Sequence, residues 1–199
     1  GNLVEDTQYK YAYDEENRLT QVTRKFDDKA VGQYQYDALS RRIVKIADPA
    51  LGPPTPVETR YFHDGTRIIE EHNSIGATLA TYVYGNYIDE LVTMDRGGQS
   101  FFYHQNTLWS VAAVTDNAGS VVERYSYDAY GLPNVTNGAG VPVAPNSWGT
   151  AHSTIGNPSM FTGRQFEEET GIYFYRARYY DPMKGRFLQR DPFEGLYWN

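Results

Sequence analysis

Along the first part of the chain, aromatic and aliphatic residues alternate with polar ones in a unit that repeats. The clearest form is Tyr-x-Tyr-Asp, followed after a few small or polar residues by Arg-Leu or Arg-Ile, as in 11–19 and 34–43. Two tyrosines that are two residues apart lie on one face of a strand. The Asp is expected to end the strand by accepting hydrogen bonds from backbone N–H groups of a turn. In the return strand, residues 19–23 are predicted to alternate with a period of two, so each unit is predicted to be a β-hairpin.

The unit recurs roughly 20 to 27 residues apart, which is typical of a repeat architecture. A single hairpin is marginal in water, whereas stacked hairpins bury each other's faces. We therefore predict an all-β fold, in which tandem hairpins form a curved or spiralling antiparallel sheet and a partial shell. The repeat-signature residues are Tyr11, Tyr13, Asp14, Tyr34, Tyr36, Asp37, Tyr61, Asp64, Tyr82, Tyr84, Tyr125, Tyr127 and Asp128.

Composition divides the chain into three parts. Residues 1–132 are predicted to be the hairpin array, with a proline-rich extended connector at 48–56. Residues 133–159 are rich in Gly, Pro, Asn and Ala, which predicts an irregular loop. Residues 160–199 have a different, Arg- and Tyr-rich character. Neither end of the sequence has the composition of a natural terminus, so we expect the chain to be part of a longer protein.

From Phe161 the sequence runs F-T-G-R-Q-F-E-E-E-T-G-I-Y-F-Y-R-A-R-Y-Y-D-P and continues M-K-G-R-F-L-Q-R-D-P. This stretch resembles the repeat-associated core of RHS proteins. The upstream units resemble the YD repeats of bacterial RHS proteins, Tc-toxin C components and, more distantly, teneurins. The residues that carry the resemblance to the core are Gly163, Arg164, Gly171, Arg178, Tyr179, Tyr180, Asp181, Pro182, Gly185, Arg186 and Phe187.

The resemblance implies a structural function. In such proteins the hairpins wind into a hollow shell, and this chain would supply a piece of its wall together with a truncated core segment that plugs or closes one end. The shell would encapsulate or present a C-terminal effector of a secreted or cell-surface bacterial protein. The implied partners are the upstream repeats and the effector of the same parent chain.

An enzymatic alternative also follows from the resemblance, because the core of related bacterial proteins is an aspartyl autoprotease. Asp191, with Arg190 beside it, aligns with a catalytic aspartate, and Glu168 stands where some members have a partner acid. Such a mechanism needs two close carboxyl groups, one protonated and one ionised to activate water. The competing interpretation is structural, with Asp-Pro turns and ordinary salt bridges. The bond to be cut would also lie downstream of Asn199.

A third alternative is a surface adhesin. The chain has 18 Tyr, against 9 Phe and 3 Trp. Exposed tyrosine rings could stack on glycans, whereas buried rings would be cross-strand packing. Open sheet edges could also recruit a partner or a second copy of the chain.

Charge and composition weigh against other classes. The net charge of -7 disfavours a nucleic-acid surface, which needs a basic stripe. The absence of cysteine excludes disulfides and thiolate chemistry. The four histidines are scattered, so we expect no metal site and no cofactor. No apolar run reaches the roughly 18 residues of a membrane-spanning helix.

Overall fold

The computed structural model describes residues 1–47 and 56–191 and is built almost entirely of β-strands. A large antiparallel sheet has twelve strands, each paired with its neighbours in the sequence, and a small sheet has four. The prediction of an all-β array of hairpins is confirmed. The strands of the large sheet are β1 (Tyr9–Tyr13), β2 (Leu19–Arg24), β3 (Lys29–Tyr36), β4 (Arg42–Ala47), β5 (Val57–Asp64), β6 (Arg67–Asn73), β7 (Thr78–Tyr84), β8 (Leu91–Arg96), β9 (Gln99–Gln105), β10 (Val111–Thr115), β11 (Val121–Tyr127) and β12 (Pro133–Asn137).

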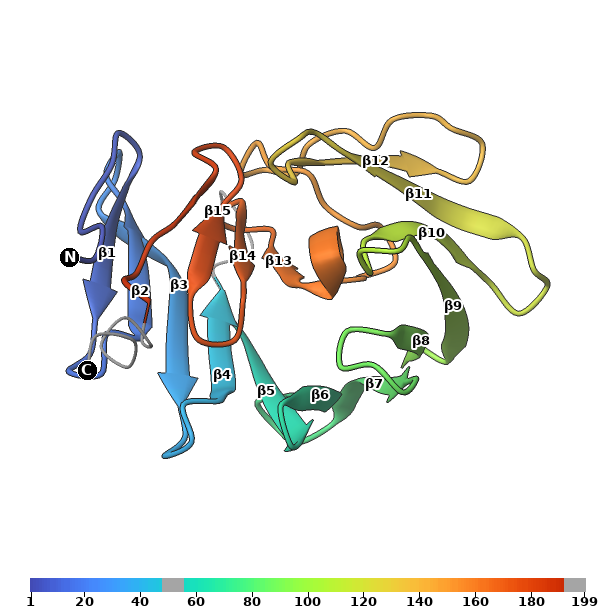
Figure 1. Cartoon of the computed structure of the whole chain (residues 1–199), viewed down its shortest axis with the longest axis horizontal. Coiled ribbons are helices and arrows are strands. Elements are labelled where there is room, and N and C mark those ends of the chain that lie inside the picture. The colour runs from blue at the N-terminus through green and yellow to red at the C-terminus, as the bar shows by residue number, and fades with distance from the viewer. Residues whose placement is uncertain (48–55, 192–199) are drawn as a thin grey trace, which may run out of the picture.

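The large sheet, which we call the wall, bends into an open arc (Figure 1). The small sheet lies on its concave side and consists of β13 (Gln165–Glu167), β14 (Ile172–Phe174), β15 (Tyr179–Asp181) and β16 (Arg186–Phe187). We call residues 159–191 the core segment. The wall does not close, and β1 and β12 are its edges. In the described part of the chain, the helical structure is one 3-10 turn at Phe161–Gly163, and no helix could cross a membrane.

Each return strand of the early hairpins carries a β-bulge. In the β1–β2 pair, Ala12 faces Gln21 and Tyr13 faces Leu19, so Thr20 has no partner. A bulge of this kind reverses the alternation of the faces. Leu19 and Val22 are therefore both fully buried, three residues apart. The predicted period-two alternation of residues 19–23 was wrong. At the equivalent bulges of other strand pairs, the residues without a cross-strand partner are Ile43, Ile69, Val92 and Ala112.

A single type of turn closes most of the hairpins. Oδ1 of Asp14 accepts hydrogen bonds from the backbone N–H groups of Glu16 at 3.0 Å and Arg18 at 2.9 Å. Asn17, with φ of 62°, occupies the left-handed region, in which short polar residues are tolerated. The same side-chain bonds are made by Asp37, Asn73, Asn106, Asp116, Asp128, Asn137 and Asn146. Asp64 differs, because it ends β5 and faces Arg67 across a tighter turn.

The segment between the wall and the core is more regular than predicted. Residues 133–137 form β12, which pairs with β11 along its whole length. Pro133 is the first residue of this edge strand, a position where a missing backbone N–H is tolerated. The predicted irregular loop over 133–159 is therefore a strand at its start. The predicted connector falls mainly on 48–55, which lie outside the described residues.

Apolar packing joins the core segment to the wall in two clusters. Met160, Phe166 and Tyr173 pack with buried residues of β5 to β12. Ile172, Phe174, Tyr179 and Leu188 pack with buried residues of β1 to β3. Because each cluster includes both parts, neither the wall nor the core segment has a complete apolar core by itself.

Candidate functional site

The strand β4 places two cations at inward positions that hold aliphatic residues in β2, β8 and β10. Arg18 binds the Asp14 carboxylate through Nε at 2.7 Å, and Arg41 binds Asp37 in the same way at 2.7 Å. The sequence had suggested Arg42 as the counterpart of Arg18, but the turn geometry shows that Arg41 is. Arg42 instead takes the inward position that Leu19 occupies in β2.

Lys45 likewise takes the inward position that Val22 occupies in β2. Leu19 and Val22 are fully buried in β2, as are Leu91 and Met94 in β8. A charged group at such a position must be paired, because an isolated buried ion is very costly. The core segment supplies the missing anions.

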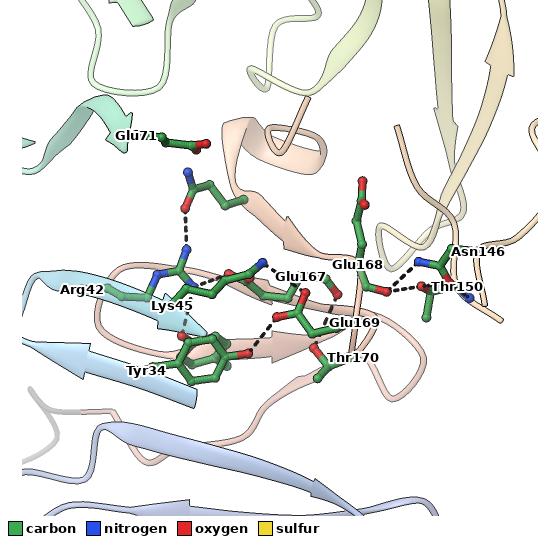
Figure 2. A network of polar contacts seen from close by, with 12 residues as sticks. Tyr34, Arg42, Lys45, Glu71, Asn146, Thr150, Glu167, Glu168, Glu169 and Thr170 are labelled. Carbon is green, nitrogen blue, oxygen red and sulfur yellow. Dashed lines mark hydrogen bonds and ion pairs between the residues drawn. The ribbon is translucent and has the colours of Figure 1, made fainter. Parts of the chain in front are cut away.

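Figure 2 shows how the charges meet. Arg42 donates hydrogen bonds to the Glu167 carboxylate, to Oε1 of Gln165 at 2.6 Å and to the Tyr179 hydroxyl at 3.2 Å. The Lys45 ammonium lies 2.6 Å from Oε2 of Glu167 and 3.1 Å from Oε2 of Glu169. We call Arg42, Lys45, Glu167 and Glu169 the ionic anchor. It joins β4 of the wall to the residues around the end of β13.

Aromatic rings surround the ionic anchor. The Arg42 guanidinium lies over the Phe174 ring, 4.1 Å from its centroid, and over the Tyr61 ring at 4.8 Å. The Tyr34 hydroxyl donates to Oε1 of Glu169 at 3.4 Å. Only 1% of the Arg42 side chain is exposed to solvent. The charges therefore act at short range with little screening by water.

The carboxyl groups of the E-E-E-T-G stretch differ in their electrostatics. Burial opposes ionisation of Glu167, but the charges of Arg42 and Lys45 dominate and lower its pKa. Burial raises the pKa of Glu169, and the neighbouring charge of Glu167 raises it further against the effect of Lys45. Burial also raises the pKa of Glu168 to about 7. Its carboxylate accepts the Ser153 N–H at 2.8 Å and points away from the ionic anchor (Figure 2).

The structure places the three predicted catalytic residues apart. Glu168 lies in the turn between β13 and β14 and bonds to Ser153. Asp191 forms an ion pair with Arg178 at 3.1 Å, in the turn between β14 and β15, and thus near the opposite end of β14. The Arg190 backbone N–H donates to Asn2 at 3.2 Å, and its side chain is exposed. In this arrangement the three residues do not form one site.

The residues that carry the resemblance to the RHS core stabilise the core segment or bind it to the wall. Arg164 binds Asp89 at 2.9 Å, and Asp181 binds Lys184, which also reaches Asp6 at 2.7 Å. The remaining residues form turns or packing contacts. Gly163, Gly171 and Gly185 have positive φ, and Tyr179 and Pro182 are buried. The Tyr180 hydroxyl donates to the Tyr130 carbonyl, and the Phe187 ring packs under the Arg178 guanidinium. Arg186 lies opposite Asp181 in the β15–β16 strand pair.

The repeat tyrosines are part of the wall's interior. In several units the hydroxyl of the first tyrosine donates to a carboxylate, and that of the second donates to a backbone carbonyl. The first kind comprises Tyr11 to Asp6, Tyr34 to Glu169, Tyr82 to Glu71 and Tyr125 to Glu123. The second kind comprises Tyr13 to Leu3, Tyr36 to Leu19 and Tyr127 to Val111. The tyrosine rings therefore pack inside the wall, and their hydroxyls form internal hydrogen bonds.

Comparison with known proteins identifies the family. The Teneurin YD-shell family model matches residues 1–198. The chain belongs to this family. This confirms the resemblance seen in the repeats and in the core segment.

Individual relatives are much longer than this chain. It is 34% identical over 197 residues to the tRNA3(Ser)-specific nuclease WapA of Bacillus spizizenii, covering 98% of this chain and 8% of that protein. It is 28% identical over 208 residues to double-stranded DNA deaminase toxin A of Burkholderia cenocepacia, covering 92% of this chain and 14% of the relative. The crystal structure of TcdB2-TccC3 shares the fold, with a TM-score of 0.65 and 21% identity over 94% of this chain and 9% of that one.

Sequence reasoning missed the ionic anchor. Its signal was present, because Arg42 and Lys45 interrupt aliphatic positions when the repeats are aligned at the turn Asp. The identity of the partners could not be found this way. Glu167 is 125 residues from Arg42, and no local pattern connects them.

Proposed function

We propose that this chain is a structural piece of a shell that encloses or presents a C-terminal effector of a longer parent protein. The observation that carries the proposal is the ionic anchor, which fixes the core segment to the concave side of the curved wall. Breaking one partner of a buried ion pair is strongly destabilising. The anchor therefore suits a segment that must stay in place while a chain beyond it occupies the interior.

The relatives support this proposal through their size. The nuclease and deaminase activities in their names belong to proteins of which this chain matches 8% and 14%. We infer that the parent of this chain is secreted or held at a bacterial cell surface. Its upstream hairpins would continue the sheet at the β1 edge, where Val4 and Asp6 already bond to the β1 backbone, and its effector would follow the core segment.

The test is limited proteolysis of the full-length parent protein, followed by mass spectrometry. We expect the effector to resist trypsin in the wild type and to become sensitive in a Glu167→Gln, Glu169→Gln double variant, which removes the anions of the anchor. Glu58→Gln is the matched control, because Glu58 forms a more exposed pair with Arg60. An effector that is cut as fast in the wild-type parent as in isolation would contradict encapsulation.

An aspartyl autoprotease remains the second candidate. It is favoured by the pKa of about 7 at Glu168, which keeps a buried carboxyl largely protonated below neutral pH. Bringing it to Asp191 would require a rearrangement of the core segment. The intact mass of the parent decides: two pieces in the wild type and one in Asp191→Asn would establish the protease, with Asp64→Asn as a control that should still cleave.

The adhesin alternative has no comparable support. The repeat-signature tyrosines are buried or half-buried within the wall, so their rings offer no open stacking face for a sugar.

A further inference from the structure

A cavity lies between the wall and the core segment, on the side of the β3–β4 and β5–β6 turns. Its volume is about 380 Å³, within the size range of small-ligand pockets. The wall contributes residues 39–42, His63, residues 66–68, Tyr84 and Asp89. The core segment contributes Ser159, residues 163–165, Phe174, Arg176 and Ala177.

Arginines dominate the polar part of this cavity. Among the described residues, Asp89 is the single carboxylate in the lining. The arginines are Arg41, Arg42, Arg67, Arg164 and Arg176.

The charges of these arginines are not fully balanced. Arg41 is paired with Asp37, and Arg42 with Glu167. Arg164 and Arg176 share one oxygen of Asp89, at 2.9 and 2.5 Å. Burial lowers the pKa of Arg164, and the charge of Arg176 lowers it further against the effect of Asp89.

Arg67 adds a further positive charge. Its Nη2 donates to the backbone carbonyls of Gly85 at 3.1 Å and Asn86 at 3.2 Å, and within the described residues it forms no ion pair. Its guanidinium also lies over the Tyr84 ring, 5.5 Å from the centroid. The lining thus carries a positive excess from Arg67 and from the pair that shares Asp89.

Unused hydrogen-bonding groups cluster at the same place. Nε of Arg42, Nδ1 of His63 and Nε of Arg164 are buried and have no partner. All three residues line the cavity. Buried polar groups without partners are rare in native proteins and call for an explanation, such as a ligand.

The lining also includes the apolar side chains of Leu39, Ile68 and Phe174. Leu39 is 73% exposed and stands at the mouth, whereas Phe174 is 6% exposed and lies deep in the structure. Guanidinium groups bind planar carboxylates with matching geometry. Among the residues that the structure describes, the lining contains no lysine and no run of backbone N–H groups from consecutive glycines, which are features of phosphate sites.

We propose that this cavity binds an acidic peptide, with a carboxylate side chain among the arginines and an apolar neighbour against Leu39, Ile68 and Phe174. The proposal goes beyond the shell function, because the chemistry is the same whether the peptide comes from the parent chain or from another protein.

The test uses this chain and two capped, fluorescein-labelled peptides, Ala-Leu-Glu-Leu-Ala and Ala-Leu-Gln-Leu-Ala, with binding followed by anisotropy. We expect the Glu peptide to bind. The Gln peptide should bind at least about tenfold more weakly, because it lacks the charge-assisted contact with the arginines. Arg67→Gln and Arg176→Gln should each weaken binding of the Glu peptide by about tenfold. Arg60→Gln, on the same hairpin as Arg67 but outside the lining, should leave binding unchanged.

Circular dichroism and thermal melting of each variant separate loss of binding from loss of the fold. Equal binding of the two peptides, or an equal effect of Arg60→Gln, would overturn the proposal. Binding of inorganic phosphate in place of the Glu peptide would overturn the assignment to a carboxylate. None of these outcomes depends on whether an effector is enclosed.

Discussion

At the residue scale, the chain uses its repeat to place charges where a repeat normally places aliphatic side chains. Arg42 and Lys45 take the inward positions of Leu19 and Val22, and the core segment meets them with Glu167 and Glu169. A buried ion network of this kind contributes little net stability compared with apolar packing, but it is costly to break. It therefore fixes which part of the chain docks on β4.

Removing one partner of the anchor should be strongly destabilising. We expect Arg42→Met to lower the free energy of unfolding by about 3–5 kcal/mol, because Glu167 is left buried with one cation fewer. Urea denaturation measures this change. Arg41→Gln removes the neighbouring, more exposed pair with Asp37 and should cost less than about 1 kcal/mol. Equal effects of the two substitutions would contradict the assigned roles.

Glu168 should make stability depend on pH. Its pKa is about 7 in the folded protein, against an unperturbed value of 4.5. Between these two pH values, the folded state holds a proton that the unfolded state has released. Stability from this group is full below pH 4.5 and is lost as pH rises toward 7, by on the order of 1–3 kcal/mol.

Glu168→Gln tests this expectation. Gln keeps an acceptor for the Ser153 N–H but does not ionise, so the variant should be more stable than the wild type at pH 8 and similar at pH 4. Urea denaturation across this range measures both. A variant that is less stable than the wild type at pH 8 would show that the ionised carboxylate is stabilising.

At the scale of the elements, the turn chemistry determines the hairpins. The Tyr-x-Tyr-Asp pattern predicted the strands and the turn, since both depend on local geometry. The bulges were not predictable, because they are set by how two strands pair, and the skipped positions hold residues as different as Thr20 and Ile43. The strand β12 was missed because its Pro and Asn residues are also typical of loops.

The turn can be tested at a neutral residue. Asn106 accepts the N–H groups of Leu108 at 2.9 Å and Ser110 at 3.0 Å, and Ser110 is buried. Asn106→Ala should therefore lower the free energy of unfolding by about 1–2 kcal/mol, as measured by urea denaturation. Asp64→Ala, in the tighter turn, should change it by less than about 0.5 kcal/mol. If Asn106→Ala lowered the free energy of unfolding by no more than Asp64→Ala does, the side-chain bonds of Asn106 would be unimportant for stability.

At the scale of the whole molecule, the core segment and the wall form one structure. Both apolar clusters and the ionic anchor span the two parts. The sequence indicated the array and the presence of a core segment, but it could not show that the segment lies inside the arc. That arrangement depends on contacts between residues more than a hundred positions apart, such as Arg42 with Gln165.

Native-state hydrogen exchange tests this central claim most directly. The amides of β14 should open with the same free energy as those of β3 and β4, within about 1 kcal/mol, because the core segment and the wall unfold together. Exchange of β13 to β16 at a free energy several kcal/mol lower, with β3 and β4 still protected, would show a separate core resting on an independent wall and would contradict the account.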